Sequence, residues 1–366
     1  MPVKPLPQNP SLVHLKHQAK DLLKEHAARD PQAAQRIKEF HPRFERALDP
    51  EIFEVRLSLS DAQLTIAREH GFPSWPRLKR HIEKPTLADR LDLPHHERIE
   101  DVPFRRAVDL LDAGDVAGLR QHLGQHRNLV HEHVLFEGGN YFQNPTLLEF
   151  VAENPVRHGK LPQQIVEVAK VILDAGAEQS ALNETLGLVS SGMVARQFRV
   201  QVPLIALLCA HGADPNGALH GAVLHGEFEA VNALLACGGR VDLPIAAALG
   251  RTEEAGRLLP NADSKQRHLA VTLAAMFGHV EIVTMLLDTG EDPDRYNPIG
   301  AHAHSTPLHQ AALAGHAGLV RLLVERGARL DIKDIIWHGS PADWARHGGK
   351  TEVERYLREA EKKKSA

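Results

Sequence analysis

The sequence predicts an all-α protein made of stacked helix–turn–helix repeats, and three observations lead to this prediction. The stretch Ser305–His316 reads STPLHQAALAGH, and a second apolar segment follows it and ends at Gly327. Similar pairs of short apolar segments recur through the last two thirds of the chain. Aromatic residues make up only 5% of the chain, which suits helix pairs that pack through Ala and Leu. Neither segment of a pair is long enough to bury its apolar face alone, so neighbouring pairs must stack.

The N-terminal part of the chain predicts a separate helical module. Residues 1–9 are rich in proline, and we expect them to be disordered. Four helix-start patterns then predict a module over residues 10–84. These patterns are Ser11, Asp30 followed by Pro31, Ser60–Gln63, and Ser74 followed by Trp75 and Pro76. Residues 85–103 are expected to link the module to the repeats.

The repeats are expected to occupy residues 104–360, followed by a charged tail at 361–366. Eight units can be recognised by their glycine-ended apolar segments. They start near Arg105, Thr146, Thr185, Ala218, Leu243, Leu269, Thr306 and Gly339. The second unit carries an insertion around Asn154–Leu161. The spacing from Gly212 to Gly239 is shorter than the roughly 33 residues of the best-matching repeat class, so the fourth and fifth units should lack a projecting hairpin.

The seventh unit explains why each segment forms a helix. Thr306 can cap the first helix, and Pro307 suits its first turn, where a missing N–H costs nothing. Gly315 and Gly327 can take the positive φ that ends a helix.

This unit resembles the ankyrin repeat, whose TPLH signature stands here as Thr306–His309. The resemblance is strong for the last three units and weak for the first two. It implies a solenoid of helix pairs with short β-hairpin loops, which is a binding scaffold rather than an enzyme. It also implies that His309 hydrogen-bonds backbone groups of neighbouring loops, and that Thr306, Pro307, His309, Gly315 and Gly327 are structural residues.

The module also resembles a known segment. Residues Leu15–Phe44 and Leu59–Glu83 are similar to a helical segment that precedes ankyrin repeats in bacterial proteins. No defined activity is implied by that resemblance. It indicates a bacterial origin.

Composition narrows the partner and the compartment. The net charge of −4 gives no indication of a nucleic-acid partner. Two cysteines, Cys209 and Cys237, cannot form a disulfide framework for this length, which favours a reduced cytoplasmic protein. The first residues lack the apolar core of a signal peptide, and no run of 18 apolar residues predicts a membrane span. We therefore expect a cytoplasmic monomer that binds no membrane.

Catalytic and cofactor motifs receive no support from the residues. The 24 histidines include the close pair His302 and His304, but no HExxH motif or ordered Cys/His spacing accompanies them. The run Gly348–Thr351 resembles the end of a phosphate-binding loop, but Trp344 stands where that motif needs glycine. No GxSxG elbow is present. We expect no catalytic residue, no cofactor and no metal.

Two loops carry the residue types that dominate protein interfaces. The loop before Thr306 and the loop before Ser340 belong to consecutive units, so their tips should lie side by side. Their candidate partner-binding residues are Arg295, Tyr296, Asn297, His302, His304, Ile335, Ile336, Trp337 and His338. A third loop, before Thr146, adds Phe136, Tyr141 and Phe142. Packing against a neighbouring loop and binding of a partner explain these residues equally well at this point.

The function that follows is protein–protein interaction through the concave face and the loop tips. An inhibitor, immunity or effector-type protein is one alternative, and it also acts by binding. A cryptic metal-dependent or hydrolytic enzyme hidden in the divergent insertions is another.

Overall fold

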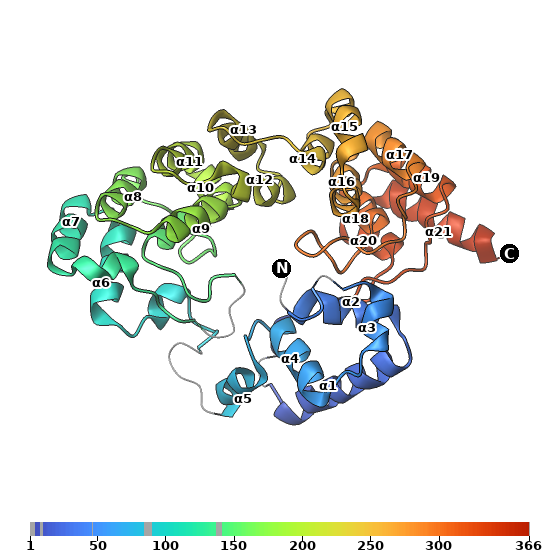
Figure 1. Ribbon diagram of the computed structural model, residues 1–366, viewed down its shortest axis with the longest axis horizontal. Coiled ribbons are helices and arrows are strands. Elements are labelled where there is room, and N and C mark those ends of the chain that lie inside the picture. Colours follow the sequence, from blue (N-terminus) through green and yellow to red (C-terminus); the bar gives the residue numbers. More distant parts are fainter. Residues whose placement is uncertain (1–3, 8–9, 46, 84–89, 137–140, 366) are drawn as a thin grey trace. The chain divides into compact units, whose positions relative to one another are not determined.

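The computed structural model describes residues 4–7, 10–45, 47–83, 90–136 and 141–365, and within these ranges it contains helices and loops but no strand. The chain forms two compact units. The terminal unit combines Met1–Trp75 with Val241–Ala366, and the central unit comprises Pro76–Arg240 (Figure 1). The ends of the chain therefore belong to one unit although the sequence separates them. No helix in the described ranges has both the length and the apolar character needed to cross a bilayer.

The terminal unit begins with four helices, which we call the N-terminal module. They are α1 (Leu12–Ala27), α2 (Pro31–Phe40), α3 (Asp49–Glu54) and α4 (Leu59–Glu69). Ser11 accepts the His14 N–H and Asp30 accepts the Gln32 N–H, as the capping patterns predict. The module has a core of its own, with Leu22, Ile37, Ile52 and Ile66 fully buried.

Three details of this module differ from the sequence prediction. The helix expected to open at Ser74, α5 (Trp75–Glu83), belongs to the central unit from Pro76 onward. The helix α3 was not predicted; its first turn contains Asp49 and Glu51, which suit a helix N-terminus. The cap of α4 is Ser58 rather than Ser60, because Ser58 and Asp61 hydrogen-bond each other's backbone N–H in a capping box.

Parts of the predicted N-terminal segment and of the predicted linker lie outside the described residues. This holds for residues 1–3 and 8–9 of the expected disordered segment and for 84–89 around the expected linker. Lys4 is described, and its N–H donates to the Glu69 carbonyl over 2.7 Å. At the other end, the last helix continues to Ser365, through most of the expected tail. The linear division into domains stays a prediction.

The central unit contains four helix pairs after α5 (Trp75–Glu83) and the 3₁₀ turn His95–Arg98. The first pair is α6 (Val102–Ala113) and α7 (Val116–Gln125), followed by a 3₁₀ turn at Arg127–His131. The second pairs a 3₁₀ helix (Leu148–Ala152) with α8 (Ile165–Asp174). The third has α9 (Gln179–Ser190) and α11 (Gln201–Ala210), with the short α10 (Met193–Gln197) between them. The fourth is α12 (Pro215–Leu224) and α13 (Phe228–Ala236).

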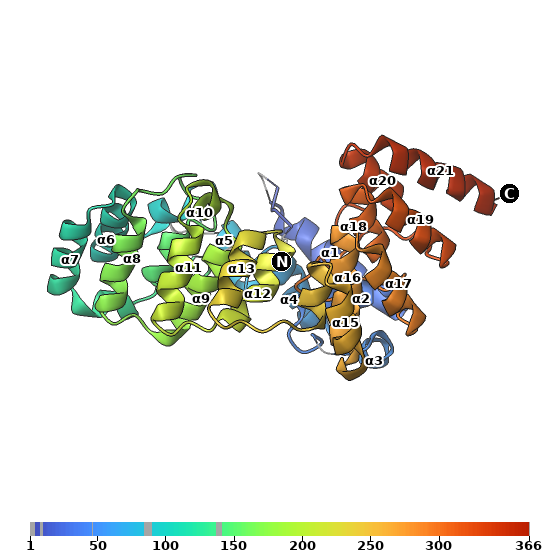
Figure 2. The same cartoon turned by 90° about the horizontal axis from the view of Figure 1, so that it is seen from above.

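The terminal unit contains the other four pairs. They are α14 (Leu243–Ala248) with α15 (Thr252–Leu258), α16 (Ser264–Phe277) with α17 (Val280–Asp288), α18 (Pro307–Ala314) with α19 (Ala317–Glu325), and α20 (Pro341–His347) with α21 (Thr351–Ser365). A 3₁₀ turn, Leu259–Asn261, follows α15. Figure 2 shows α16, α18 and α20 in one row and α17, α19 and α21 in a second row beside it. The expected stacking of helix pairs is therefore observed in this unit.

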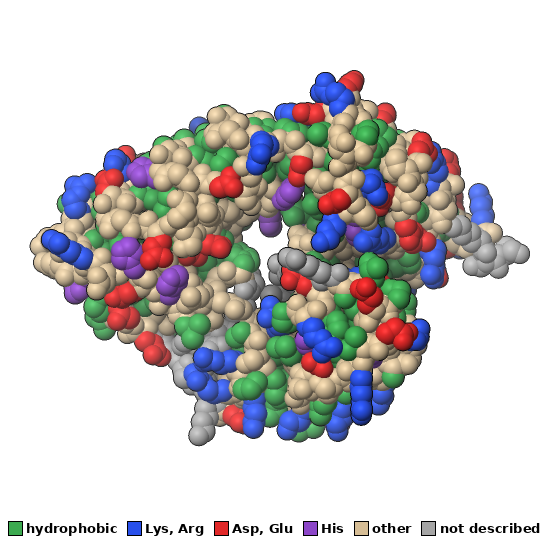
Figure 3. All heavy atoms as spheres, in the orientation of Figure 1, with side chains coloured by type: hydrophobic (Ala, Val, Ile, Leu, Met, Phe, Trp, Pro, Cys, Tyr) green, Lys and Arg blue, Asp and Glu red, His purple; other side chains and the backbone are tan. Residues whose placement is uncertain are grey.

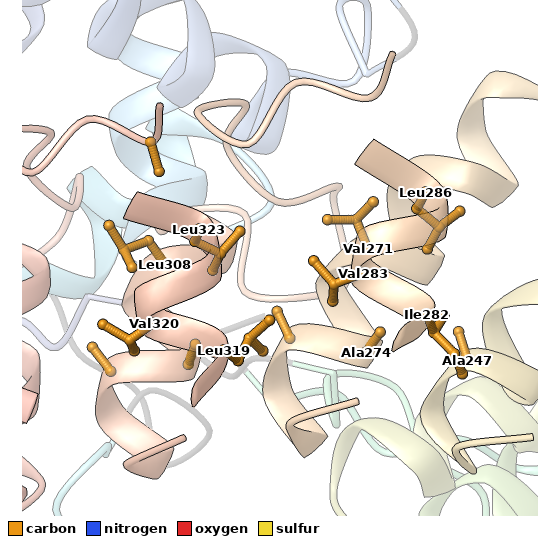
Figure 4. Packing of buried hydrophobic residues seen from close by; sticks show 14 of the residues in the cluster. Ala247, Val271, Ala274, Ile282, Val283, Leu286, Leu308, Leu319, Val320 and Leu323 are labelled. Atoms are coloured by element: carbon orange, nitrogen blue, oxygen red, sulfur yellow. The ribbon is translucent and has the colours of Figure 1, made fainter. Parts of the chain in front are cut away.

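A continuous apolar core joins these last four pairs. It includes Val271, Ile282, Leu308 and Leu323 (Figure 4), and its fully buried alanines let successive helices approach closely. Histidines add a polar tie between pairs. His279 Nε2 hydrogen-bonds the Ala248 carbonyl over 3.0 Å, and His316 Nε2 repeats this contact at Met276 over 2.9 Å. Each tie satisfies a carbonyl at the end of the preceding inner helix.

Candidate protein-binding surface

The loop between α17 and α18 is shaped from inside by Asn297. This residue is 0% exposed. Its N–H donates to the Ser305 carbonyl over 2.8 Å, and its Nδ2 donates to Ser305 Oγ over 3.2 Å. Its Oδ1 accepts from Thr272 Oγ1 on α16. These bonds satisfy a buried amide and fix the loop against the preceding inner helix.

His309 ties this loop to the next one. Its Nδ1 accepts the Thr306 N–H over 3.2 Å, so the proton of the neutral ring is assigned to Nε2, which contacts the Gly339 carbonyl over 3.2 Å. The ring is fully buried, and burial lowers the pKa of His309 to about 4. Thr306 precedes the helix, Pro307 is its first residue, and Gly315 ends it with a φ of 84°. Gly327, after the partner helix, has a φ of 95°.

The loop between α19 and α20 is organised by the buried carboxylate of Asp334. Its Oδ1 accepts the N–H groups of Ile336 (3.0 Å) and Trp337 (2.7 Å). Its Oδ2 accepts the N–H of Gly339 over 2.7 Å and the indole Nε1–H of Trp344 over 3.0 Å. A carboxylate with four donors makes charge-assisted hydrogen bonds that hold the loop in one conformation. The backbone that carries Trp337 is therefore held in one conformation.

The two loops lie side by side. Tyr296 Oη donates to the Lys333 carbonyl over 2.6 Å, and the Ile335 N–H donates to the His304 carbonyl over 2.9 Å. The His304 ring stands edge-on to Trp337 at a centroid distance of 5.2 Å. The adjacency of the tips, which the repeat spacing predicted, is thus present. The contact between the two loops consists of hydrogen bonds to backbone groups and the ring contact of His304 with Trp337. No strand is formed in these described residues.

The candidate residues divide by exposure. Trp337 is 64% exposed, and Arg295 and His338 are also exposed. Tyr296, His302 and Ile336 are half-buried. We call these six residues the tip surface. Asn297, His304 and Ile335 are buried within their own chain, so they support the loops and offer no area to a partner. Of the nine candidate residues on these two loops, six therefore remain candidates for partner contact. The sequence could not separate them, because loop side chains follow no fixed pattern of inward and outward positions.

Both loops turn at a histidine with a left-handed backbone. The φ angle is 60° at His302 and 55° at His338. Such angles are uncommon outside glycine, although histidine adopts them more often than most residues. Strained residues concentrate at functional loops, and His338 directly follows the exposed Trp337.

The loop before Thr146 belongs to the central unit and behaves differently. Phe136 and Phe142 are buried and stack at 6.1 Å, and Phe142 also packs edge-on to Phe150 at 5.2 Å. Phe136 and Phe142 therefore act as core residues. Tyr141 is exposed, and its hydroxyl donates to Asn154 Oδ1. Only Tyr141 of this group remains a candidate for partner contact.

Histidines and charged side chains are also present in and around the tip surface. In the described ranges no three His, Cys, Asp or Glu side chains are grouped so that they could hold a metal ion. Burial lowers the pKa of His304 to about 4, and His302 adds to the shift. Acidic and basic side chains are interspersed on the face that Figure 3 shows. The tip surface offers aromatic and polar contact area.

Two residues that organise this region were missed from the sequence. Asp334 could have been found, because an aspartate at the start of a loop commonly accepts backbone N–H groups two and three residues later. Gln35 of α2, whose Nε2 donates to the Ala303 carbonyl over 2.9 Å, had no local signal. Its role depends on a contact between segments more than 260 residues apart.

Comparison with known proteins identifies the repeat. A family model described as "Ankyrin repeats (3 copies)" matches residues 243–334, which span α14 to α19 and the loop after them. The chain is 37% identical over 119 residues to cyclin-dependent kinase inhibitor 2A of Monodelphis domestica, covering 31% of this chain and 67% of the relative. It is 35% identical over 123 residues to the Homo sapiens protein of that name (32% and 76%). It is 33% identical over 126 residues to cyclin-dependent kinase 4 inhibitor B of Bos taurus (33% and 92%).

Proposed function

Because the chain belongs to the ankyrin repeat family, we propose that it is a scaffold that binds a protein partner through the tip surface. The observation that carries this proposal is the exposure of Trp337 on a loop fixed by the buried Asp334. An exposed tryptophan on a rigid base loses little conformational entropy on binding and can bury a large apolar area. Arg295 and Tyr296 are the other residue types that dominate interface energies.

The proposal includes no chemical step, cofactor or nucleic acid. Binding uses the tip surface, and the protein is proposed to act as a cytoplasmic monomer. The resemblance of the N-terminal segments motivates a bacterial origin, whereas the relatives reported above come from mammals. Analytical ultracentrifugation of the purified chain measures its oligomeric state and so tests whether it is a monomer.

A narrower proposal is that binding inhibits the partner. The relatives reported above are named as inhibitors, which favours this form of the function over a passive scaffold. If the captured partner is an enzyme, its activity should fall as the chain is added and recover with Trp337→Ala. Unchanged activity in a saturated complex would restrict the function to scaffolding.

Affinity capture from an extract of the native organism tests the proposed function. Wild type, Trp337→Ala and a control, Phe228→Ala, are immobilised and the retained proteins are compared by mass spectrometry. Phe228 is 39% exposed and lies in the central unit, so its loss removes an exposed aromatic without touching the tip surface. A partner retained by wild type and Phe228→Ala but lost from Trp337→Ala supports the proposal. A partner set that is the same for all three proteins contradicts it.

A further inference from the structure

The N-terminal module contacts the loops that carry the tip surface. The Gln35 Nε2 of α2 donates to the Ala303 carbonyl in a buried hydrogen bond of 2.9 Å. Three residues earlier on α2, Gln32 lines a pocket together with Ile336 and His338 of the tip loop. Figure 1 shows α2 next to the loops that lead into α18 and α20. A segment of this chain therefore already occupies part of the region in which the partner-binding residues lie.

The apolar cluster that joins the helix pairs of the repeats does not include the N-terminal module. The apolar cluster of the repeats runs from Leu243 to Leu357 and contains no residue of the N-terminal module. The module buries Leu22, Ile37 and Ile52 among its own helices. Opening of the contact with α2 would therefore remove no side chain from this apolar cluster of the repeats.

The contact itself is polar and incompletely filled. A pocket of about 230 Å³ lies between them. Its lining includes Arg36, Phe40 and Glu69 from the module, and Ile335, Ile336 and His338 from the tip loop. Most other lining side chains are charged or amides, as in contacts between domains that move relative to each other. Arg36 is paired with Glu69 inside the module over 2.7 Å, so that ion pair does not depend on the tip loops.

A partner centred on Trp337 must reach the residues that α2 approaches. A stable interface buries about 800 Å² on each side, several times the area of one tryptophan. Ile336 and His338 flank Trp337 in the sequence and line the pocket against the module. Gln32 and Arg36 of α2 line the same pocket. An interface of ordinary size therefore competes with α2 for these residues.

We propose that the N-terminal module is a displaceable occupant of the tip surface, and that a protein partner binds by taking these residues from α2. This inference rests on the proposed function, because it concerns access to the same surface. The undocked state is then the binding-competent state. A partner's apparent affinity is reduced by the fraction of molecules in which α2 is docked.

The first test uses the full chain alone and compares wild type, Gln35→Glu and the control Gln63→Glu. Gln35→Glu replaces the donor to the Ala303 carbonyl with a carboxylate, which repels that oxygen. Gln63 lies on α4 of the same module, so it provides the same charge change away from this bond. Hydrogen exchange measured by mass spectrometry should speed up in α2 and in residues 296–305 and 333–339 for Gln35→Glu only. Exchange in α17 and α19 should not change.

Two results of this experiment would overturn the inference. One is unchanged exchange in the tip loops of Gln35→Glu. The other is a Gln35→Glu protein in which α16 to α19 lose protection together with α2, because the module would then be integral to the repeats. Gln35→Ala serves as a second variant if the carboxylate prevents folding.

The second test uses the partner that depends on Trp337. Gln35→Glu should bind it more tightly than wild type by at least about threefold, and Gln63→Glu should match wild type. Weaker or equal binding by Gln35→Glu would overturn displacement and indicate that α2 contributes to the binding surface or stays docked. If no partner depends on Trp337, the proposed function fails, while the exchange experiment still decides whether the module undocks.

Discussion

Replacing His309 with alanine should destabilise the terminal unit by an amount that its hydrogen bonds allow us to estimate. The substitution leaves the Thr306 N–H and the Gly339 carbonyl without the partners that they have at 3.2 Å. Each unpaired buried group costs roughly 1–3 kcal/mol, and partial entry of water reduces the sum to about 2–4 kcal/mol. The ring also packs edge-on to Trp344 at 5.2 Å, so tryptophan fluorescence should report the loss.

Urea unfolding at pH 7.5, followed by circular dichroism and tryptophan fluorescence, measures this effect. His316→Ala is the matched control, because its half-buried ring makes one bond, to the Met276 carbonyl. It should cost only about 0.5–1.5 kcal/mol. A His309→Ala protein within about 0.5 kcal/mol of wild type would refute the reasoning, as would equal losses for the two variants.

Buried titratable side chains give three further predictions. Burial lowers the pKa of His268 to about 3 and of His304 and His309 to about 4. Their unfolded pKa is about 6.5, so the unfolded chain binds more protons below that pH, and stability should fall by about 1–2 kcal/mol per histidine by pH 5 in urea titrations. A flat profile between pH 7 and 5 would contradict this. Burial raises the pKa of Glu39 to about 7, so folded protein favours the protonated acid and loses stability as pH rises from 4.5 through 7. Glu39→Gln should therefore stabilise the protein by about 1–3 kcal/mol at pH 8 and leave it unchanged at pH 4.5, and equal effects at both pH values would argue against the assignment. Asp334→Ala removes the acceptor of three backbone N–H groups and the Trp344 indole, so it should lower Tm by several degrees and weaken partner binding. Normal binding by a folded Asp334→Ala protein would show that the loop needs no such support.

Much of the repeat architecture could be predicted because its signals are local. Thr306, Pro307 and Gly315 each perform a backbone task that one residue type does well, and they mark the bounds of a helix. The role of His309 came from the resemblance, and its geometry agrees. In the module, Ser11 and Asp30 were recognisable for the same reason. The error at Ser58 arose because Ser58 and Ser60 both stand before Asp61, and only the folded backbone selects between two candidate caps.

The candidate surface was predictable in place but not in detail. The repeat spacing brought the loops of Tyr296 and Trp337 together. It could not show that Asn297 and His304 point inward, because loop side chains follow no fixed period. The prediction that Phe142 contacts a partner met a similar difficulty, because a loop rich in phenylalanine can pack against its own repeat.

The contact between the module and the tip loops lay beyond any local pattern. Gln35 and Ala303 are separated by 268 positions, and a glutamine on a helix gives no sign of a distant acceptor. The helical spacing of apolar residues in α2 predicts that Ile37 is buried, because this pattern involves only nearby residues. The residues that the polar side chains of α2 contact are set by the tertiary fold.

The affinity of the identified partner for three proteins, measured by calorimetry, tests the central claim most directly. The proteins are wild type, Trp337→Ala and Phe228→Ala, each first shown to keep the wild-type circular dichroism spectrum. The tip-surface proposal predicts a loss of more than about thirtyfold for Trp337→Ala, which corresponds to about 2 kcal/mol, and less than about threefold for Phe228→Ala. Equal affinities for wild type and Trp337→Ala would contradict the claim that the partner binds at the tip surface.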